Sequence, residues 1–110
     1  MKRGEIVVLN LGRNIGKPRL ALVIQADLLN DMDALLTTIV LPITSELHNM
    51  EVIRYKLDPN PANGLQVVSQ VMVKKIMQIE KQKIQKVIGW LNKKQMDEIE
   101  ARLLAILGVS

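Results

Sequence analysis

Cysteine is absent from this sequence of 110 residues, and only one histidine is present. Disulfides and thiolate metal sites are therefore excluded, and a zinc site would need several carboxylates as additional ligands. Phenylalanine is also absent, and one tryptophan and one tyrosine make an aromatic content of 2%. This scarcity argues against a nucleic-acid binder that stacks successive bases on aromatic rings. We expect no metal site and no cofactor.

Long apolar segments are missing as well. A helix that spans a membrane needs a run of about 20 apolar residues. The sequence contains no such run. The first residues, MKRGEIVVLN, lack the apolar stretch and the cleavage site of a secretory signal. We therefore expect a cytoplasmic protein without a membrane partner. The length predicts one domain, residues 1–110, and 48% hydrophobic residues are enough for a core.

Positive charge is in excess, with 15 Lys and Arg residues against 11 Asp and Glu residues and a formal net charge of +4. A basic balance favours a polyanionic partner. Several lysines are close together in the last third of the chain. They predict either a track that contacts RNA phosphates or a solvated basic face. These residues are Lys74, Lys75, Lys81, Lys83 and Lys86.

Short apolar runs separated by turn residues predict a mainly β protein. The expected strands are residues 5–11, 20–25, 37–43, 51–57, 65–73 and 85–91. The first of them is apolar on both faces, which is typical of a sheet that is covered on both sides. Pro42 predicts that the third strand ends there, at an edge or at a bulge. Residues 26–36 are expected to form a short helix or an irregular segment.

A helix is predicted after the last strand. Asn92 can cap its start, with Gln95 three residues later, and Gly108 can end it. Trp90, just before the helix, is expected in the core. One face of the helix is apolar and is expected to pack against the sheet. This face consists of Met96, Ile99, Leu103, Ile106 and Leu107.

Five segments in order, KRGEIVVLNLG, PRLALVIQAD, TTIVLPITSE, NGLQVVSQVMVKKI and EKQKIQKVIGWLN, resemble the MazF/PemK family of toxin endoribonucleases. The resemblance extends from Arg3 to Gly108. It implies a small, strongly bent β-barrel of the CcdB/MazF type with a C-terminal helix. It also implies a homodimer, a small acidic antitoxin as partner, and metal-independent, sequence-specific cleavage of single-stranded mRNA to a 2′,3′-cyclic phosphate and a 5′-hydroxyl.

The resemblance also implies two catalytic residues, Arg19 in PRLALVI and Thr44 in LPITSE. Attack by a 2′-hydroxyl passes through a phosphorane with extra negative charge, which the site must bind more tightly than the ground state. A guanidinium offers a planar fork of donors to phosphate oxygens. We therefore expect Arg19 to stabilise the phosphorane and Thr44 to position the phosphate. Because a guanidinium is a poor base, the proton acceptor stays unassigned.

Lys17, Ser45 and Lys74 are predicted to bind RNA. The chain departs from the family pattern at Leu20, where members usually have proline, and at Lys74, where many have an acid. Lys74 strengthens the attraction for phosphate. In an active nuclease it could be a second phosphate clamp, or even a base if burial lowers its pKa. The alternative is a site that binds RNA and cuts slowly. His48 matches no catalytic position of the family and is interpreted as a loop histidine.

Other functions stay open. One is a catalytically weak or inactive family member that binds RNA or an antitoxin. A gyrase-targeting toxin related to CcdB ranks lower, because that activity depends on a Trp-Gly-Ile C-terminus and this chain ends AILGVS. The last is a small barrel module that docks a protein peptide, which would lack salt-dependent affinity for RNA.

Overall fold

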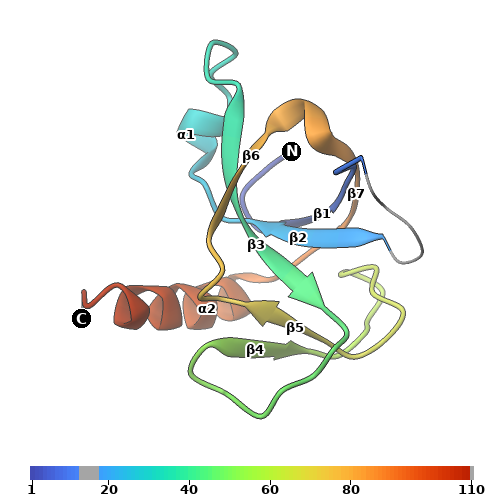
Figure 1. Cartoon of the computed structure of the whole chain (residues 1–110), viewed down its shortest axis with the longest axis vertical. Coiled ribbons are helices and arrows are strands. Elements are labelled where there is room, and N and C mark those ends of the chain that lie inside the picture. The colour runs from blue at the N-terminus through green and yellow to red at the C-terminus, as the bar shows by residue number, and fades with distance from the viewer. Residues whose placement is uncertain (13–17, 110) are drawn as a thin grey trace.

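The computed structural model describes residues 1–12 and 18–109, which form one antiparallel sheet and a long C-terminal helix (Figure 1). The fold class predicted from the sequence is confirmed. Neither α-helix in the described residues has the length and hydropathy of a membrane-spanning segment. The elements in chain order are β1 Glu5–Leu9, β2 Arg19–Val23, α1 Asp27–Asn30, β3 Thr37–Thr44, β4 Arg54–Leu57, β5 Ser69–Met72, β6 Met77–Glu80, the 3-10 turn η1 Lys81–Lys83, β7 Ile84–Trp90 and α2 Lys93–Ile106.

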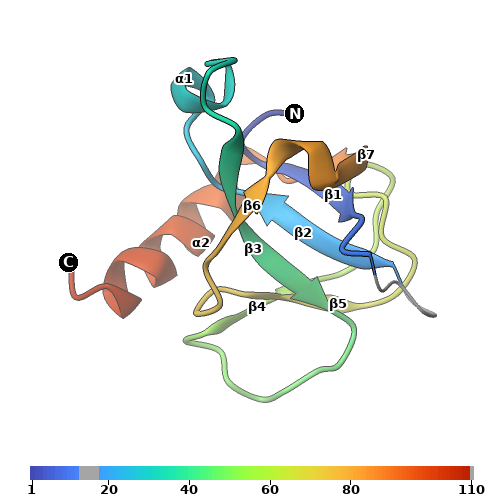
Figure 2. The ribbon, with the colours of Figure 1, turned by 45° about the horizontal axis from the view of Figure 1, so that its top comes forward.

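The strands pair in the order β4-β5-β3-β2-β1-β7, and β6 pairs with the first half of β3. The sheet coils strongly, as Figure 2 shows, but it stays open between β4 and β7 in the described residues, so "barrel" describes it only loosely. The turn of residues 58–64 bridges this opening. The Trp90 N–H in β7 donates to the Ala62 carbonyl over 3.0 Å.

The third strand is central and not an edge. β3 pairs with β2 along one side, while β6 and β5 share its other side. The strand ends at Thr44, close to the predicted end, but the prediction of an edge position at Pro42 is wrong. β6 pairs with β3 as far as Val40 and β5 begins to pair at Ile43, so Pro42, which has no N–H donor, falls where the neighbour changes.

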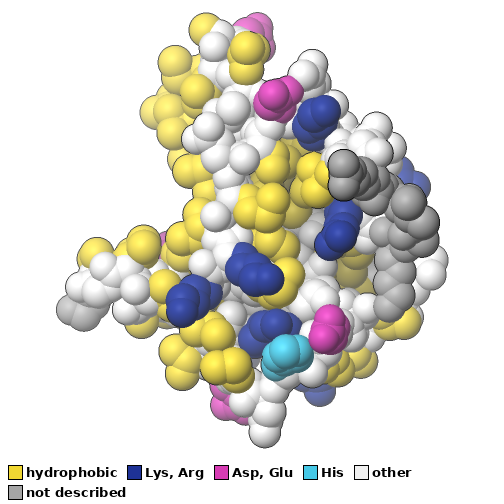
Figure 3. Space-filling view, in the orientation of Figure 1, with side chains coloured by type: hydrophobic (Ala, Val, Ile, Leu, Met, Phe, Trp, Pro, Cys, Tyr) yellow, Lys and Arg dark blue, Asp and Glu magenta, His cyan; other side chains and the backbone are white. Residues whose placement is uncertain are grey.

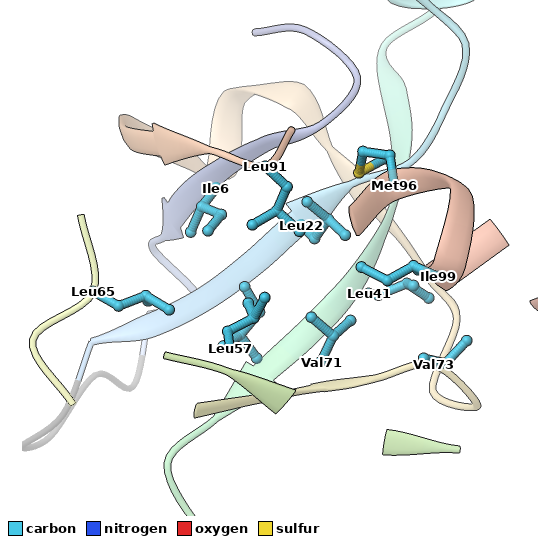
Figure 4. Packing of buried hydrophobic residues seen from close by; sticks show 11 residues of the cluster. Ile6, Leu22, Leu41, Leu57, Leu65, Val71, Val73, Leu91, Met96 and Ile99 are labelled. Carbon is cyan, nitrogen blue, oxygen red and sulfur yellow. The ribbon is translucent and has the colours of Figure 1, made fainter. Parts of the chain in front are cut away.

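Apolar side chains are buried on both faces of the sheet, which confirms the prediction for the first strand. On one face, buried residues of β1 to β5 pack under Met96 and Ile99 of α2, with Leu65, Val73 and Leu91 from the connecting segments (Figure 4). The other face carries a second cluster, made of Val7, Leu9, Ala21, Val23, Val40 and Ile79. Residues that alternate along one strand thus divide between two cores.

Local predictions for the helix are confirmed at its ends. Asn92 and Gln95 form a reciprocal capping box, and Gly108 follows the helix with φ of +75°. Trp90, however, is 57% exposed, so its placement in the core is wrong. Leu107 is also 57% exposed, because the last turn of α2 extends beyond the sheet (Figure 1).

β6 is not expected from the sequence. Its residues, MQIE, are half polar, and only Ile79 is buried. The strand forms because it pairs with β3 from Thr37 to Val40. That pairing joins residues about 40 positions apart, so no local pattern predicts it.

Candidate functional site

Arg19 and Thr44 face each other across neighbouring strands. Arg19 is the first residue of β2, and Thr44 is the last residue of β3. Leu20 pairs with Ile43 in the antiparallel register, so the next opposite positions are Arg19 and Thr44. Directly opposite residues project from the same face with Cβ atoms about 5 Å apart. The two side chains therefore belong to one small region of the sheet.

The Arg19 guanidinium is exposed at the start of β2, after Pro18. Among residues 1–12 and 18–109, none forms an ion pair or a side-chain hydrogen bond with it. An exposed guanidinium with its donors uncommitted suits an anion that presents several oxygens. Arg19 therefore does not serve the packing of the described fold.

Thr44 is half-buried and starts a turn. Its Oγ1 accepts a hydrogen bond from the Glu46 N–H over 3.0 Å. That bond uses a lone pair, so the hydroxyl hydrogen is still available to donate to a phosphate oxygen. Ser45 is exposed beside it.

Gln70 extends this region onto β5, because it pairs with Thr44. Its side-chain amide contacts the backbone of His48 twice: Nε2 donates to the carbonyl over 2.8 Å, and Oε1 accepts from the N–H over 3.0 Å. The amide thus replaces a backbone partner and fixes the loop after β3 to the sheet.

Arg54 of β4 fastens the same loop. Its Nη1 donates to the Glu46 carbonyl and to the Gln70 Oε1, each over 3.0 Å. Further along the loop, the Nε of Arg102 in α2 donates to the Glu51 carbonyl over 2.9 Å. Four side chains, from three strands and a helix, therefore hold the loop of residues 45–53. They are Thr44, Arg54, Gln70 and Arg102.

A hollow of about 410 Å³ lies between this loop and β4. Its lining mixes an imidazole with cationic, acidic and polar groups, and in Figure 3 the histidine lies beside both a basic and an acidic side chain on the lower part of the face. The lining residues are His48, Asn49, Glu51, Arg54, Tyr55, Lys56, Gln70 and Arg102. Such a hollow has the charge and the donors to bind an anionic chain.

Lys74 belongs to a second hollow, of about 330 Å³, with Ile53, Arg54, Met72 and Lys75. It lies in the turn that follows Met72, the last residue of β5, and not on the strand position beside Thr44. The structure thus brings together Arg19, Thr44 and Ser45 and leaves Lys74 apart from them. Lys17 lies outside the described residues.

The five lysines of the predicted track do not share one environment. Lys81 is half-buried, and its Nζ donates to the Asn30 carbonyl over 2.9 Å and to the Met32 carbonyl over 3.0 Å. It therefore holds the segment before β3, while the other four lysines are exposed. Its ammonium group is thus bonded within the fold, and the choice between an RNA track and a solvated basic face concerns the other four lysines.

Residues 2–107 match the family of PemK-like, MazF-like toxins of type II toxin-antitoxin systems. The chain belongs to this family. The PemK/MazF match covers nearly the whole chain and confirms the resemblance read from the sequence.

Individual relatives agree with the family assignment. A probable endoribonuclease MazF of Mycolicibacterium smegmatis is 32% identical over 111 residues, which cover 100% of this chain and 99% of the relative. The Mycobacterium tuberculosis toxin MazF-mt6 superposes with a TM-score of 0.80 at 20% identity, covering 96% of this chain and 98% of that one. An endoribonuclease in complex with its cognate antitoxin, from a mycobacterial species, gives 0.76 at 16% identity, covering 100% and 95%. At these identities the two structures show only that the fold is shared.

Within this PemK/MazF fold, sequence reasoning missed the group formed by His48, Arg54 and Gln70. One signal was present: Arg54 and Lys56 alternate with Tyr55 and Leu57, which places the two cations on one face of β4. The contact of Gln70 with His48 joins positions 22 residues apart and has no local signal. No group of three His, Asp or Glu side chains that could hold a metal ion occurs in residues 1–12 and 18–109.

Proposed function

We propose that this PemK/MazF toxin is an endoribonuclease that cleaves single-stranded mRNA without a metal ion, leaving a 2′,3′-cyclic phosphate and a 5′-hydroxyl. One observation carries the proposal: Arg19, whose side chain is exposed, and Thr44 occupy the two strand positions that follow the Leu20–Ile43 pair in register. The 32% identity to a protein named a probable endoribonuclease supports it.

In this proposal Arg19 binds the non-bridging oxygens of the scissile phosphate as negative charge develops on them. Donors that meet this charge as it develops bind the transition state more tightly than the ground state. The Thr44 hydroxyl donates to the same phosphate and holds it in line with the attacking 2′-oxygen. Ser45 and Lys17 contact the adjoining backbone, and Lys74 contacts a phosphate further along the RNA.

The family assignment also supports a proposal for the partners of this chain. We propose a homodimer of one MazF/PemK-like domain, residues 1–110, whose site is masked by a small acidic antitoxin. One relative is named as a complex with its cognate antitoxin. The proposed place of action is the cytoplasm, where mRNA is translated.

The test compares the wild-type protein with Arg19→Ala, Arg19→Lys and Lys94→Ala on a long single-stranded transcript, with EDTA present. We expect cleavage by the wild type and a loss of about 100- to 1,000-fold in kcat/KM for Arg19→Ala. Arg19→Lys keeps the charge but not the planar fork, so it restores only part of the rate. Lys94, exposed on α2, controls for the loss of one positive charge.

The products are examined for a cyclic phosphate and a 5′-hydroxyl. Intact RNA at high protein concentration, with no difference between wild type and Arg19→Ala, would contradict the proposal. Retained binding of RNA without cleavage would instead favour the second candidate, a non-cutting RNA binder. The exposed cations at Arg19, Lys74 and Lys75 are the observation that favours that candidate.

A further inference from the structure

Cleavage through a 2′-hydroxyl needs a proton acceptor, and the pair Arg19 and Thr44 does not contain one. We propose that the imidazole of His48 is the general base that takes the 2′-hydroxyl proton, an inference that rests on the proposed function. Imidazole is the side chain whose ordinary protonation equilibrium lies near neutral pH, which suits this task. His48 lies in the loop after β3, as the sequence predicts, and the proposal assigns it a role there.

His48 is held to the same region as Thr44. Gln70 pairs with Thr44 in the sheet, and its amide makes both hydrogen bonds to the His48 backbone. Thr44 also accepts from the N–H of Glu46, two residues before the histidine. Gln70 of β5 therefore fixes the His48 backbone, and Thr44 fixes the backbone two residues before it. General-base catalysis requires such positioning within hydrogen-bond reach of the proton.

The imidazole itself is accessible. The His48 side chain is 48% exposed and lines the larger hollow. Its Nε2 lies 3.6 Å from Oε1 of Glu46. In a neutral imidazole one nitrogen donates and the other accepts, so an Nε2–H turned toward the carboxylate leaves the Nδ1 lone pair for the substrate.

The other charged groups of the hollow suit an RNA backbone. Two carboxylates come from the loop itself, and the remaining groups come from β4 and α2. Cations that attract phosphate thus surround a base that accepts a proton. The titratable and charged groups that face the hollow or His48 are Glu46, Glu51, Arg54, Tyr55, Lys56 and Arg102.

The proposed step conserves atoms and charge. The neutral imidazole takes the proton of the 2′-hydroxyl, and the 2′-oxygen forms a bond to phosphorus. The bond from phosphorus to the 5′-oxygen breaks, and that oxygen takes a proton from water. The imidazolium then returns its proton to solvent. The products are a 2′,3′-cyclic phosphate, a 5′-hydroxyl and neutral His48.

The experiment first maps a cut site in the transcript and then uses an oligonucleotide that spans it. Single-turnover cleavage is measured from about pH 5 to 8 for the wild type, His48→Gln, His48→Ala and Leu47→Ala. Because the loop is held through the His48 backbone, replacing the side chain leaves its anchors in place. Leu47 is exposed in the same loop and serves as the matched control.

We expect His48→Gln to lower the maximal rate at least about 100-fold, with KM little changed. The rise in rate from acidic to neutral pH should disappear in this variant. Added imidazole should restore part of the rate of His48→Ala and leave Leu47→Ala unaffected. RNA binding by the variants should persist.

Either of two results would overturn the inference: an unchanged rate and pH profile in His48→Gln, or a change confined to KM. In both cases the proposed function survives if Arg19→Ala still lowers the rate. If the wild type does not cut RNA at all, the proposed function itself fails. The two failures are therefore distinguishable.

Discussion

Among single residues, Tyr55 has a pKa that its surroundings shift strongly. Its hydroxyl donates to Oε2 of Glu98 over 2.6 Å, and the Arg102 guanidinium lies 4.9 Å from the centre of its ring. Burial, followed by the hydrogen bond and the charge of Glu98, raises the pKa of Tyr55 from 10.0 to about 12. The contact joins β4 to α2 beside the larger hollow.

A first prediction follows from this pKa. Because it is raised in the folded protein, the unfolded chain loses the tyrosine proton first. The stabilisation from neutral Tyr55 is therefore fully present below about pH 10 and is lost as the pH rises toward 12. Tyr55 is the only tyrosine, so tyrosinate absorbance reports on it alone. We expect half-ionisation near pH 12 in the folded protein and near 10 in urea.

Glu98→Gln is the control for this titration. It removes the carboxylate charge and leaves the burial, so the midpoint should fall part of the way toward 10. Equal midpoints in the folded and unfolded protein would show that the contact with Glu98 does not form in solution.

At the scale of elements, helix α2 begins with a complete capping box. The Gln95 N–H donates to Asn92 Oδ1 over 2.8 Å, and the Asn92 N–H donates to Gln95 Oε1 over 3.1 Å. Both bonds satisfy donors that a helix start otherwise leaves to water. The first buried residues of the helix, Met96 and Ile99, follow directly. The cap thus fixes where the apolar face meets the sheet.

A second prediction concerns this cap. Asn92→Ala should lower the free energy of unfolding by about 1 kcal/mol, since the side-chain acceptor is lost. Asn92→Asp retains an acceptor and should unfold nearly as the wild type does. Urea unfolding followed by circular dichroism measures both. If the two variants have the same midpoint, the cap contributes nothing to stability.

The strands illustrate which elements a sequence reveals. The runs that become β1, β2, β3 and β7 are apolar enough to be recognised, although β1 ends at Leu9 rather than at residue 11. β6 is four residues long and forms only through its pairing with β3. β3 is a central strand, but its proline is typical of an edge strand. The proline is tolerated because it lies between the part of β3 that pairs with β6 and the part that pairs with β5.

At the scale of the whole molecule, the turn of residues 58–64 holds the open side of the sheet. Asn63 is fully buried there, and its side chain bonds to the backbone of Asp58, Asn60 and Leu65. The turn packs directly on β7: a Cβ built at Gly89 would lie 2.3 Å from the Asn63 carbonyl carbon. Only a glycine permits this approach.

A third prediction tests that contact. Gly89→Ala should lower the free energy of unfolding by about 3 kcal/mol, because the turn must move away from β7. Gly108→Ala is the contrasting variant: its φ is +75°, but a Cβ there meets no atom within 4 Å. Strain from the left-handed backbone alone should cost about 1 kcal/mol. Thermal unfolding that ranks the two variants equally would mean that the turn does not pack on β7.

The class of the fold, the start and end of the last helix, and the family can all be read from the amino-acid sequence. Each depends on residues close together in the chain or on blocks in a fixed order. The sequence also singled out Arg19 and Thr44, through the family resemblance. The tertiary structure decided that the two are neighbours in the sheet, that Lys74 stands apart from them, and that Gln70 holds His48. It also decided that Trp90 is exposed and that the sheet stays open. These features arise from strand register and from side chains that meet across distant segments, which a linear pattern does not contain.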